Sequence, residues 1–138
     1  MVTVRYEHQF SYTIDPLVGP IPALQLEIAT PEGARWLEAE ACLDSGASRS
    51  LFDGQLAFAL GLDLLARHTM PFLGTAGTRL NAVMHRVRLR HDLMGEFELE
   101  VGFSTAPITR NLLGRDFFNL VQVGFRESQL TFYISTTP

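Results

Sequence analysis

The segment Ala41-Cys42-Leu43-Asp44-Ser45-Gly46-Ala47-Ser48 decides how the rest of this 138-residue sequence is interpreted. It places a carboxylate at the end of an apolar strand and follows it with a hydroxyl, a glycine and two small residues. Small residues let two backbones approach closely, and the Ser45 hydroxyl can form a hydrogen bond across such a contact. An aspartate held about 3 Å from a second aspartate cannot be ionised together with it, because like charges separate the two titrations. One carboxyl group then acts as base and the other as acid, which makes Asp44 a candidate for general acid–base catalysis on a water molecule.

Asp-Ser-Gly is also ordinary turn sequence, so the tripeptide alone leaves a plain loop aspartate as an open alternative. The surrounding sequence adds strands on both sides of it. Residues 23–29 and 36–43 alternate apolar and polar side chains around a turn at 31–33, which predicts a β-hairpin. After the loop, we expect a short strand over 50–52 and a short capped helix over 55–60.

The remainder of the chain continues this pattern of short strands. We predict strand character over 68–87 with a tight glycine turn at 74–77, strands over 83–90, 97–103 and 129–134, and a helix from about 115 to 121. Strands at intervals of about ten residues with two short helices indicate an all-β barrel or sandwich. Residues 1–22 contain three prolines and are expected to form an extended arm or edge strand, which leaves 23–138 as the domain proper.

The composition and charge of the chain exclude several classes of function. The chain has a net charge of -4, with 15 acidic against 11 basic residues, which argues against a nucleic-acid surface. Arg86, Arg88 and Arg90 would share one solvated face of a strand. The single cysteine excludes an internal disulfide and a multi-cysteine metal site. No signal peptide or apolar run of about 20 residues is apparent, so we expect a cytoplasmic protein without membrane contact, metal or cofactor.

The order of these segments resembles the retropepsin-like aspartic proteases. That family carries Asp-Thr/Ser-Gly-Ala, then a flap hairpin, then an apolar pair followed by Gly-Arg-Asp/Asn that leads into a helix. Here the corresponding segments are 44–47, 74–77 and Leu112-Leu113-Gly114-Arg115-Asp116, and the match extends from about Leu24 to Ile134. The resemblance implies an all-β barrel half with short helices and an active site at a homodimer interface.

The resemblance also implies roles for individual residues. Asp44 matches the catalytic aspartate, Ser45 the hydroxyl residue that bonds across the dimer axis, and Gly46 the small residue beside it. Substrate contacts would come from Ala47 and Ser48 and from the flap tip, Gly74, Thr75, Ala76 and Gly77. Structural support would come from Leu113, Gly114, Arg115 and Asp116, with Arg115 matching the arginine that buttresses the catalytic loop. The family often has an aspartate paired with that arginine where this chain has Ser48, so the pair is absent here.

A pair of catalytic aspartates requires two equivalent loops, and this chain contains only one Asp-Ser/Thr-Gly. An active enzyme would therefore be a homodimer, with Asp44 of each subunit facing across a two-fold axis. The resemblance further implies an intersubunit sheet, for which Tyr133, Ile134 and the arm before Ala23 are candidates.

Several residues also have simple structural interpretations. Cys42 is expected to pack as a small hydrophobe rather than act as a nucleophile, and the four histidines show no metal-like spacing. The turn at 74–77 could be an ordinary hairpin turn. Core packing accounts for four apolar residues at helical spacing, Phe117, Phe118, Leu120 and Val121. Glu96, Glu98 and Glu100 are expected on a solvated edge that discourages aggregation.

The leading hypothesis is a homodimeric aspartic endopeptidase that binds extended peptides or its own precursor as an added strand. Candidate pocket walls are Leu51, Phe72, Leu73 and Ile108. A non-catalytic dimeric module that binds peptides or partner proteins in the same cleft is the alternative, since fold does not imply function. A scaffold domain that has lost its partner is a third possibility.

Overall fold

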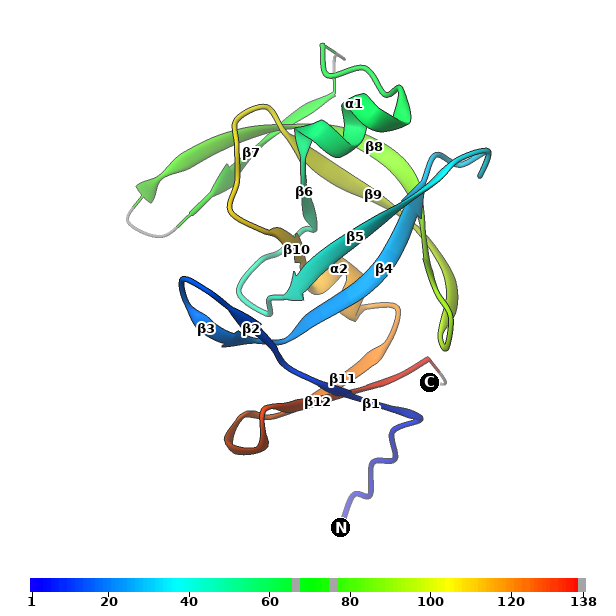
Figure 1. Ribbon diagram of the computed structural model, residues 1–138, viewed down its shortest axis with the longest axis vertical. Coiled ribbons are helices and arrows are strands. Elements are labelled where there is room, and N and C mark those ends of the chain that lie inside the picture. The colour runs from blue at the N-terminus through cyan, green and yellow to red at the C-terminus, as the bar shows by residue number, and fades with distance from the viewer. Residues whose placement is uncertain (66–67, 75–76, 137–138) are drawn as a thin grey trace.

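A computed structural model describes residues 1–65, 68–74 and 77–136 of the chain (Figure 1). Strands dominate the described residues, with two short α-helices and a 3₁₀ turn, which confirms the all-β expectation. The elements are β1 (His8–Ser11), β2 (Thr13–Asp15), β3 (Gly19–Ile21), β4 (Ala23–Ala29), β5 (Trp36–Leu43), β6 (Leu51–Asp53), α1 (Gly54–Leu60), β7 (Thr69–Leu73), β8 (Arg79–His91), β9 (Gly95–Ser104), β10 (Asn111–Leu113), α2 (Arg115–Phe118), β11 (Gln122–Arg126), η2 (Glu127–Gln129) and β12 (Thr131–Ser135).

The largest sheet has seven strands in the order β4-β5-β10-β6-β9-β8-β7. Strand β4 also pairs with β8 through residues 27–29 and 88–90, so the sheet folds back on itself around one core. The predicted hairpin over 23–29 and 36–43 is confirmed, with Ala23 opposite Cys42 and Ala29 opposite Trp36. Edge strand β7 accommodates Pro71 because a proline has no N–H to donate to a ladder.

Strand β10 is the element that positions the Asp44 segment. It lies between β5 and β6 and runs parallel to β5, with Leu112 opposite Cys42 and Leu113 opposite Leu43. The chain therefore inserts a late segment beside the strand that leads into Asp44. This arrangement brings two of the sequence motifs, 44–47 and 112–116, into direct contact.

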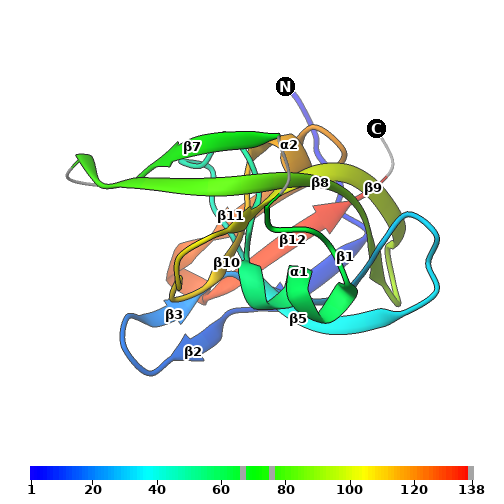
Figure 2. The ribbon, with the colours of Figure 1, turned by 90° about the horizontal axis from the view of Figure 1, so that it is seen from above.

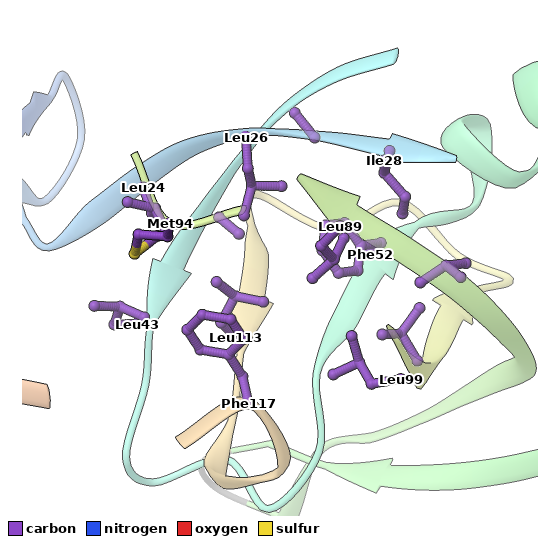
Figure 3. Packing of buried hydrophobic residues seen from close by; sticks show 14 of the residues in the cluster. Leu24, Leu26, Ile28, Leu43, Phe52, Leu89, Met94, Leu99, Leu113 and Phe117 are labelled. Atoms are coloured by element: carbon purple, nitrogen blue, oxygen red, sulfur yellow. The ribbon is translucent and has the colours of Figure 1, made fainter. Parts of the chain in front are cut away.

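The core fills the space enclosed by the folded sheet. Leu43, Leu113 and Phe117 lie together beneath the end of β5, as Figure 3 shows, and Leu113 and Phe117 have no solvent exposure. Burial of such side chains stabilises a fold by roughly 1.5–3 kcal/mol each. The segments around Asp44 thus rest on fully packed apolar residues.

A second sheet contains both ends of the chain. Its order is β1-β12-β11, and β1 pairs with β12 from His8 opposite Ile134 to Ser11 opposite Thr131 (Figure 1). Strand β12 therefore has both of its hydrogen-bonding edges occupied by its own chain. An intersubunit sheet formed by Tyr133, Ile134 and the arm before Ala23 stays a prediction.

The region after Asp116 also differs from the prediction. The helix ends at Phe118 rather than near residue 121, with Asn119 at its C-terminus, and the chain then forms strand β11, which was not predicted. Phe117 is buried and Phe118 and Val121 are partly buried, but Leu120 is 43% exposed and is not a core residue. The final strand begins at Thr131, after the η2 turn.

Glu96, Glu98 and Glu100 of β9 pair with β8 on one side, whereas β6 pairs only with residues 102–104 of the same strand. Arg86 and Arg88 of β8 form ion pairs with Glu98 and Glu96 across the ladder, and Arg90 pairs with Glu27 of β4. The predicted solvated arginine face thus exists, and the acidic residues neutralise it. Within the described ranges, no helix is both long enough and apolar enough to span a bilayer.

Candidate functional site

The Asp44 loop, defined here as residues 44–50, follows β5 and is held by β10. The Asp44 N–H donates to the carbonyl oxygen of Leu113 at 2.9 Å, which continues the β5–β10 ladder by one residue. The Asp44 carbonyl oxygen accepts from Ala47 N–H at 3.1 Å and closes a tight turn. The backbone around the candidate catalytic residue is therefore fixed from both sides.

The Asp44 carboxylate lies at the surface of this turn. Its Oδ1 accepts a hydrogen bond from Gly46 N–H at 2.8 Å, and the residue is half-buried. Ser45, Gly46 and Ser48 are exposed and Ala47 is half-buried. A carboxylate that is oriented by a backbone donor, surrounded by small exposed residues, leaves room for another chain to approach it closely.

Gly114 lies where the loop and β10 make their closest approach. A Cβ atom at this position would lie 2.7 Å from the carbonyl oxygen of Ala47 and 2.8 Å from that of Arg49. The next residue, Arg115, donates its backbone N–H to the same Ala47 oxygen at 2.8 Å. A glycine is therefore required here by space rather than by backbone angle, because a side chain would displace the loop backbone.

Asp116 supplies the side-chain support of the Asp44 loop. Its carboxylate accepts from the Ser50 hydroxyl at 2.7 Å and from Ser50 N–H at 2.9 Å. The Ser50 hydroxyl oxygen in turn accepts from Gly114 N–H at 3.1 Å. Ser50 has no solvent exposure, so this small network satisfies polar groups that would otherwise be buried without partners.

The predicted support residues thus separate into two groups. Leu113, Gly114 and Asp116 contact the Asp44 loop, whereas the Arg115 side chain is exposed and forms no hydrogen bond or ion pair within the described residues. Sequence reasoning missed Ser50, which is a serine at the start of an apolar strand. It also missed Asn111, whose side chain donates to the Glu40 carbonyl and accepts from Asp53 N–H. The sequence feature that could have indicated this role is the polar Asn111 at the start of the otherwise apolar segment 111–113.

The β7–β8 hairpin carries the second candidate substrate-contacting segment. Its strands pair from Thr69 opposite Val83 to Leu73 opposite Arg79, and Gly74 N–H donates to the Thr78 carbonyl at 2.7 Å. The hairpin projects from the body on the side to which the Asp44 loop also points (Figures 1 and 2). Gly74 and Gly77 lie at its end, with Gly77 at a φ of 74°, and the predicted contact residues Thr75 and Ala76 lie outside the described residues.

The four candidate pocket residues have different surroundings. Leu51 is 5% exposed and buried on β6. Phe72 packs its ring over Gly102 of β9, and Leu73 is 78% exposed on the hairpin. Ile108 lines a cavity of about 540 Å³ behind the segment 108–111. Arg110 and four carboxylates also line this cavity, Asp15, Glu38, Glu40 and Asp53.

Cys42 is half-buried on β5, two residues before Asp44. Burial raises the pKa of its thiol, and this effect outweighs the opposing influence of Arg110. The thiol is therefore protonated near neutral pH and is a poor nucleophile. Within the described residues, no group of three histidine, cysteine, aspartate or glutamate side chains is placed to hold a metal ion.

Comparison of the fold with solved structures yields two informative neighbours. A retropepsin-like aspartic protease from Rickettsia conorii superimposes with a TM-score of 0.63, covering 93% of this chain and 98% of that chain at 18% sequence identity. The fold is that of the retropepsin-like aspartic proteases. EIAV protease in complex with the inhibitor HBY-793 gives a TM-score of 0.54, covering 78% of this chain and 92% of that chain at 16% identity.

The expected retropepsin-like fold is therefore confirmed, and it extends over nearly the whole chain. No protein-family model matches the sequence, and no curated protein matches it either. At identities of 16% and 18%, the likeness concerns the retropepsin fold alone, and the activity has to be argued from the site.

Proposed function

We propose that this chain is the protomer of a homodimeric aspartic endopeptidase, with Asp44 of each subunit forming the catalytic pair. The observation that supports this most directly is the placement of the Asp44 carboxylate. It is oriented by Gly46 N–H on a turn that is pinned to Leu113, and it is flanked by exposed Ser45 and Gly46. Asp44 thus lies where the two-fold partner of this loop can approach.

The proposed reaction uses the two carboxyl groups with one shared proton. The ionised carboxylate takes a proton from a water molecule, whose oxygen attacks the carbonyl carbon of the peptide. The protonated carboxyl group then transfers a proton to the leaving nitrogen as the C–N bond breaks. No covalent intermediate with the protein is formed, and the β7–β8 hairpin would act as the flap that closes over an extended peptide.

The decisive experiment is digestion of a diverse peptide mixture from about pH 3 to pH 8 by the purified protein and by its Asp44→Asn variant. Cleavage by the wild-type protein alone, read by mass spectrometry, is the expected result. Equal cleavage by both proteins would exclude Asp44 as the catalytic group. If a folded wild-type dimer cleaved nothing, the non-catalytic peptide-binding module would replace the enzyme.

A further inference from the structure

The segments around Asp44 have a charge opposite to that of the rest of the protein. The Asp44 loop, the hairpin residues 69–79 and the segment 106–116 together contain four arginines and two aspartates, a net charge of +2. The whole chain has a net charge of -4, so the remaining residues carry -6. A surface region of one sign on a protein of the opposite net charge attracts oppositely charged ligands.

Neither of the two aspartates fully neutralises the positive charge of these arginines. The Asp116 carboxylate is engaged by Ser50 and by Phe117 N–H at 2.8 Å and faces the interior of the loop. Asp44 is the proposed catalytic group, and only one of two paired aspartates would be ionised. The exposed charge on these segments is therefore predominantly positive.

Arg115 is one of the arginines whose guanidinium has no hydrogen bond or ion pair within the described residues. It is exposed, and within the described residues no carboxylate lies within ion-pair distance of it. Its backbone N–H is nevertheless fixed to the Ala47 oxygen at 2.8 Å, beside the turn that carries Asp44. The side chain thus starts from a fixed point next to the candidate active site and remains available to a ligand.

Arg49 starts from a neighbouring point of the backbone. The close contact between Gly114 and the Arg49 carbonyl group brings the two arginine-bearing segments together. The Arg49 side chain is 44% exposed and lies 3.9 Å from Glu100, which also lies 3.6 Å from His68. An exposed pair at that distance is weak, so Arg49 can exchange Glu100 for a ligand carboxylate at little cost.

Arg110 has different surroundings from those of Arg49 and Arg115. Together with Asp15, Glu38, Glu40 and Asp53, it lines the cavity behind 108–111, and its Nε is buried without a hydrogen-bond partner within the described residues. Its positive charge therefore lies among carboxylates of the protein itself. Arg79 lies exposed on the β7–β8 hairpin and adds to the positive field without a fixed position near Asp44.

We propose that Arg49 and Arg115 bind an acidic side chain of the substrate, so that the preferred substrates are extended peptides with Asp or Glu within about four residues of the scissile bond. This inference rests on the proposed peptidase function. Successive residues of an extended peptide advance by about 3.3 Å, so four residues span about 13 Å, which a long arginine side chain can help to bridge. The planar guanidinium matches a carboxylate through two parallel hydrogen bonds.

The test uses peptide pairs that differ only by Glu or Gln at each position around one cleavage site. The wild-type protein, Arg49→Gln, Arg115→Gln and the double variant are compared, with Arg86→Gln as the control, because Arg86 pairs with Glu98 outside these segments. We expect kcat/KM for the best Glu peptide to exceed that for its Gln partner about three- to tenfold. The preference should disappear in the double variant, persist in Arg86→Gln, and shrink at about 0.5 M salt.

Binding to the Asp44→Asn protein separates this inference from the proposed function. Equal cleavage of Glu and Gln peptides, or a preference that survives in the double variant, would overturn the acidic-substrate inference and leave the peptidase intact. If the wild-type protein cleaves nothing but labelled Glu peptides bind more tightly than Gln peptides through Arg49 and Arg115, only the peptidase is overturned. Neither cleavage nor preferential binding would reject both.

Discussion

The Asp116 carboxylate joins the Asp44 loop to the helix behind it, and Arg115 does not. We expect Asp116→Ala to lower the free energy of unfolding by about 2–4 kcal/mol, because it leaves the buried Ser50 hydroxyl and N–H without their acceptor. Arg115→Ala should change it by no more than about 0.5 kcal/mol, since that side chain is exposed. Urea denaturation of the two variants measures both values.

Asp116→Asn provides the matched control for this pair. An amide keeps one acceptor oxygen for Ser50, so its loss of stability should lie between those of the other two variants. A larger effect for Arg115→Ala than for Asp116→Ala would show that the arginine buttresses the loop after all.

His91 gives the protein a specific pH dependence of stability. Burial is the main cause that lowers its pKa, with Asp92 opposing and the nearby His8 adding to the shift. Its ring packs edge-on against Phe10, and its Nδ1 accepts from Leu93 N–H at 3.1 Å, a bond that protonation removes. The unfolded chain therefore binds this proton more readily than the folded one, and stability falls as the pH drops below about 6.5.

The corresponding measurement is the urea midpoint of the wild-type protein and of His91→Gln at about pH 7.5 and pH 5.5. The wild-type protein should lose more stability between these two values than the variant does. Identical pH dependence of the two proteins would remove His91 as a contributor.

At the scale of residues, the chemically important carboxylates could be predicted from the sequence, but their hydrogen-bond partners could not. Asp44 and Asp116 were named from the motif, but the Ser50 hydroxyl that binds Asp116 is 66 residues away in the chain. Which of two neighbouring side chains, Arg115 or Asp116, turns toward the loop depends on the path of the helix. Phe117, the next residue of that helix, is fully buried and packs edge-on against Phe97 of β9.

At the scale of elements, the contact between β10 and the Asp44 loop tolerates no added atom. Gly114→Ala should lower the free energy of unfolding by about 2 kcal/mol or more, because its methyl group would meet two backbone carbonyl groups at 2.7 and 2.8 Å. Peptidase activity should fall even in the fraction of the variant that remains folded, since the displaced atoms belong to the loop that carries Asp44.

Gly74→Ala is the control for this substitution. Its added Cβ would lie at ordinary contact distances of 3.6 and 3.7 Å from Thr78. Denaturation midpoints that fell equally for both variants would indicate a general glycine effect rather than the close contact at Gly114.

The elements that were predicted correctly are those with local signals. The hairpin over 23–43 has alternating side chains and turn residues, and α1 begins after the capping residue Asp53 and ends at Gly61 in the left-handed region. Strand β11 has no such signal, because Val121-Gln122-Val123 continues the apolar spacing of the helix before it. Its strand conformation comes from pairing with β12, and the turn between them needs Leu130 at a φ of 50°, which its residue type does not suggest.

At the scale of the whole molecule, the proposed active site requires two protomers. The test adds an equal amount of Asp44→Asn protein to the wild-type protein. The wild-type concentration is kept constant and well above that needed for dimerisation. Wild-type chains then enter mixed dimers with the variant. Random pairing leaves about a quarter of all dimers with two intact aspartates, so the activity should fall to about half. Added Arg86→Gln protein, which keeps its own Asp44, should instead raise the total rate about twofold. A rate left unchanged by added Asp44→Asn protein would indicate that each protomer acts alone.

The overall fold could be predicted because the order of motifs along the chain limits the arrangement of a sheet of this size, and the comparison with the Rickettsia conorii protein confirms it. The pairing of the termini could not be predicted. An isolated sequence does not distinguish a strand that pairs within its own chain from one that pairs with another copy, since both present the same hydrogen-bonding groups.

The β1-β12-β11 sheet joins the two ends of one chain. Glu7 accepts hydrogen bonds from Ser135 and Thr136, and the Phe10 and Phe132 rings stack. The N-terminal strand therefore has its pairing partner within its own chain, and each terminal segment is anchored by residues from the opposite end of the sequence.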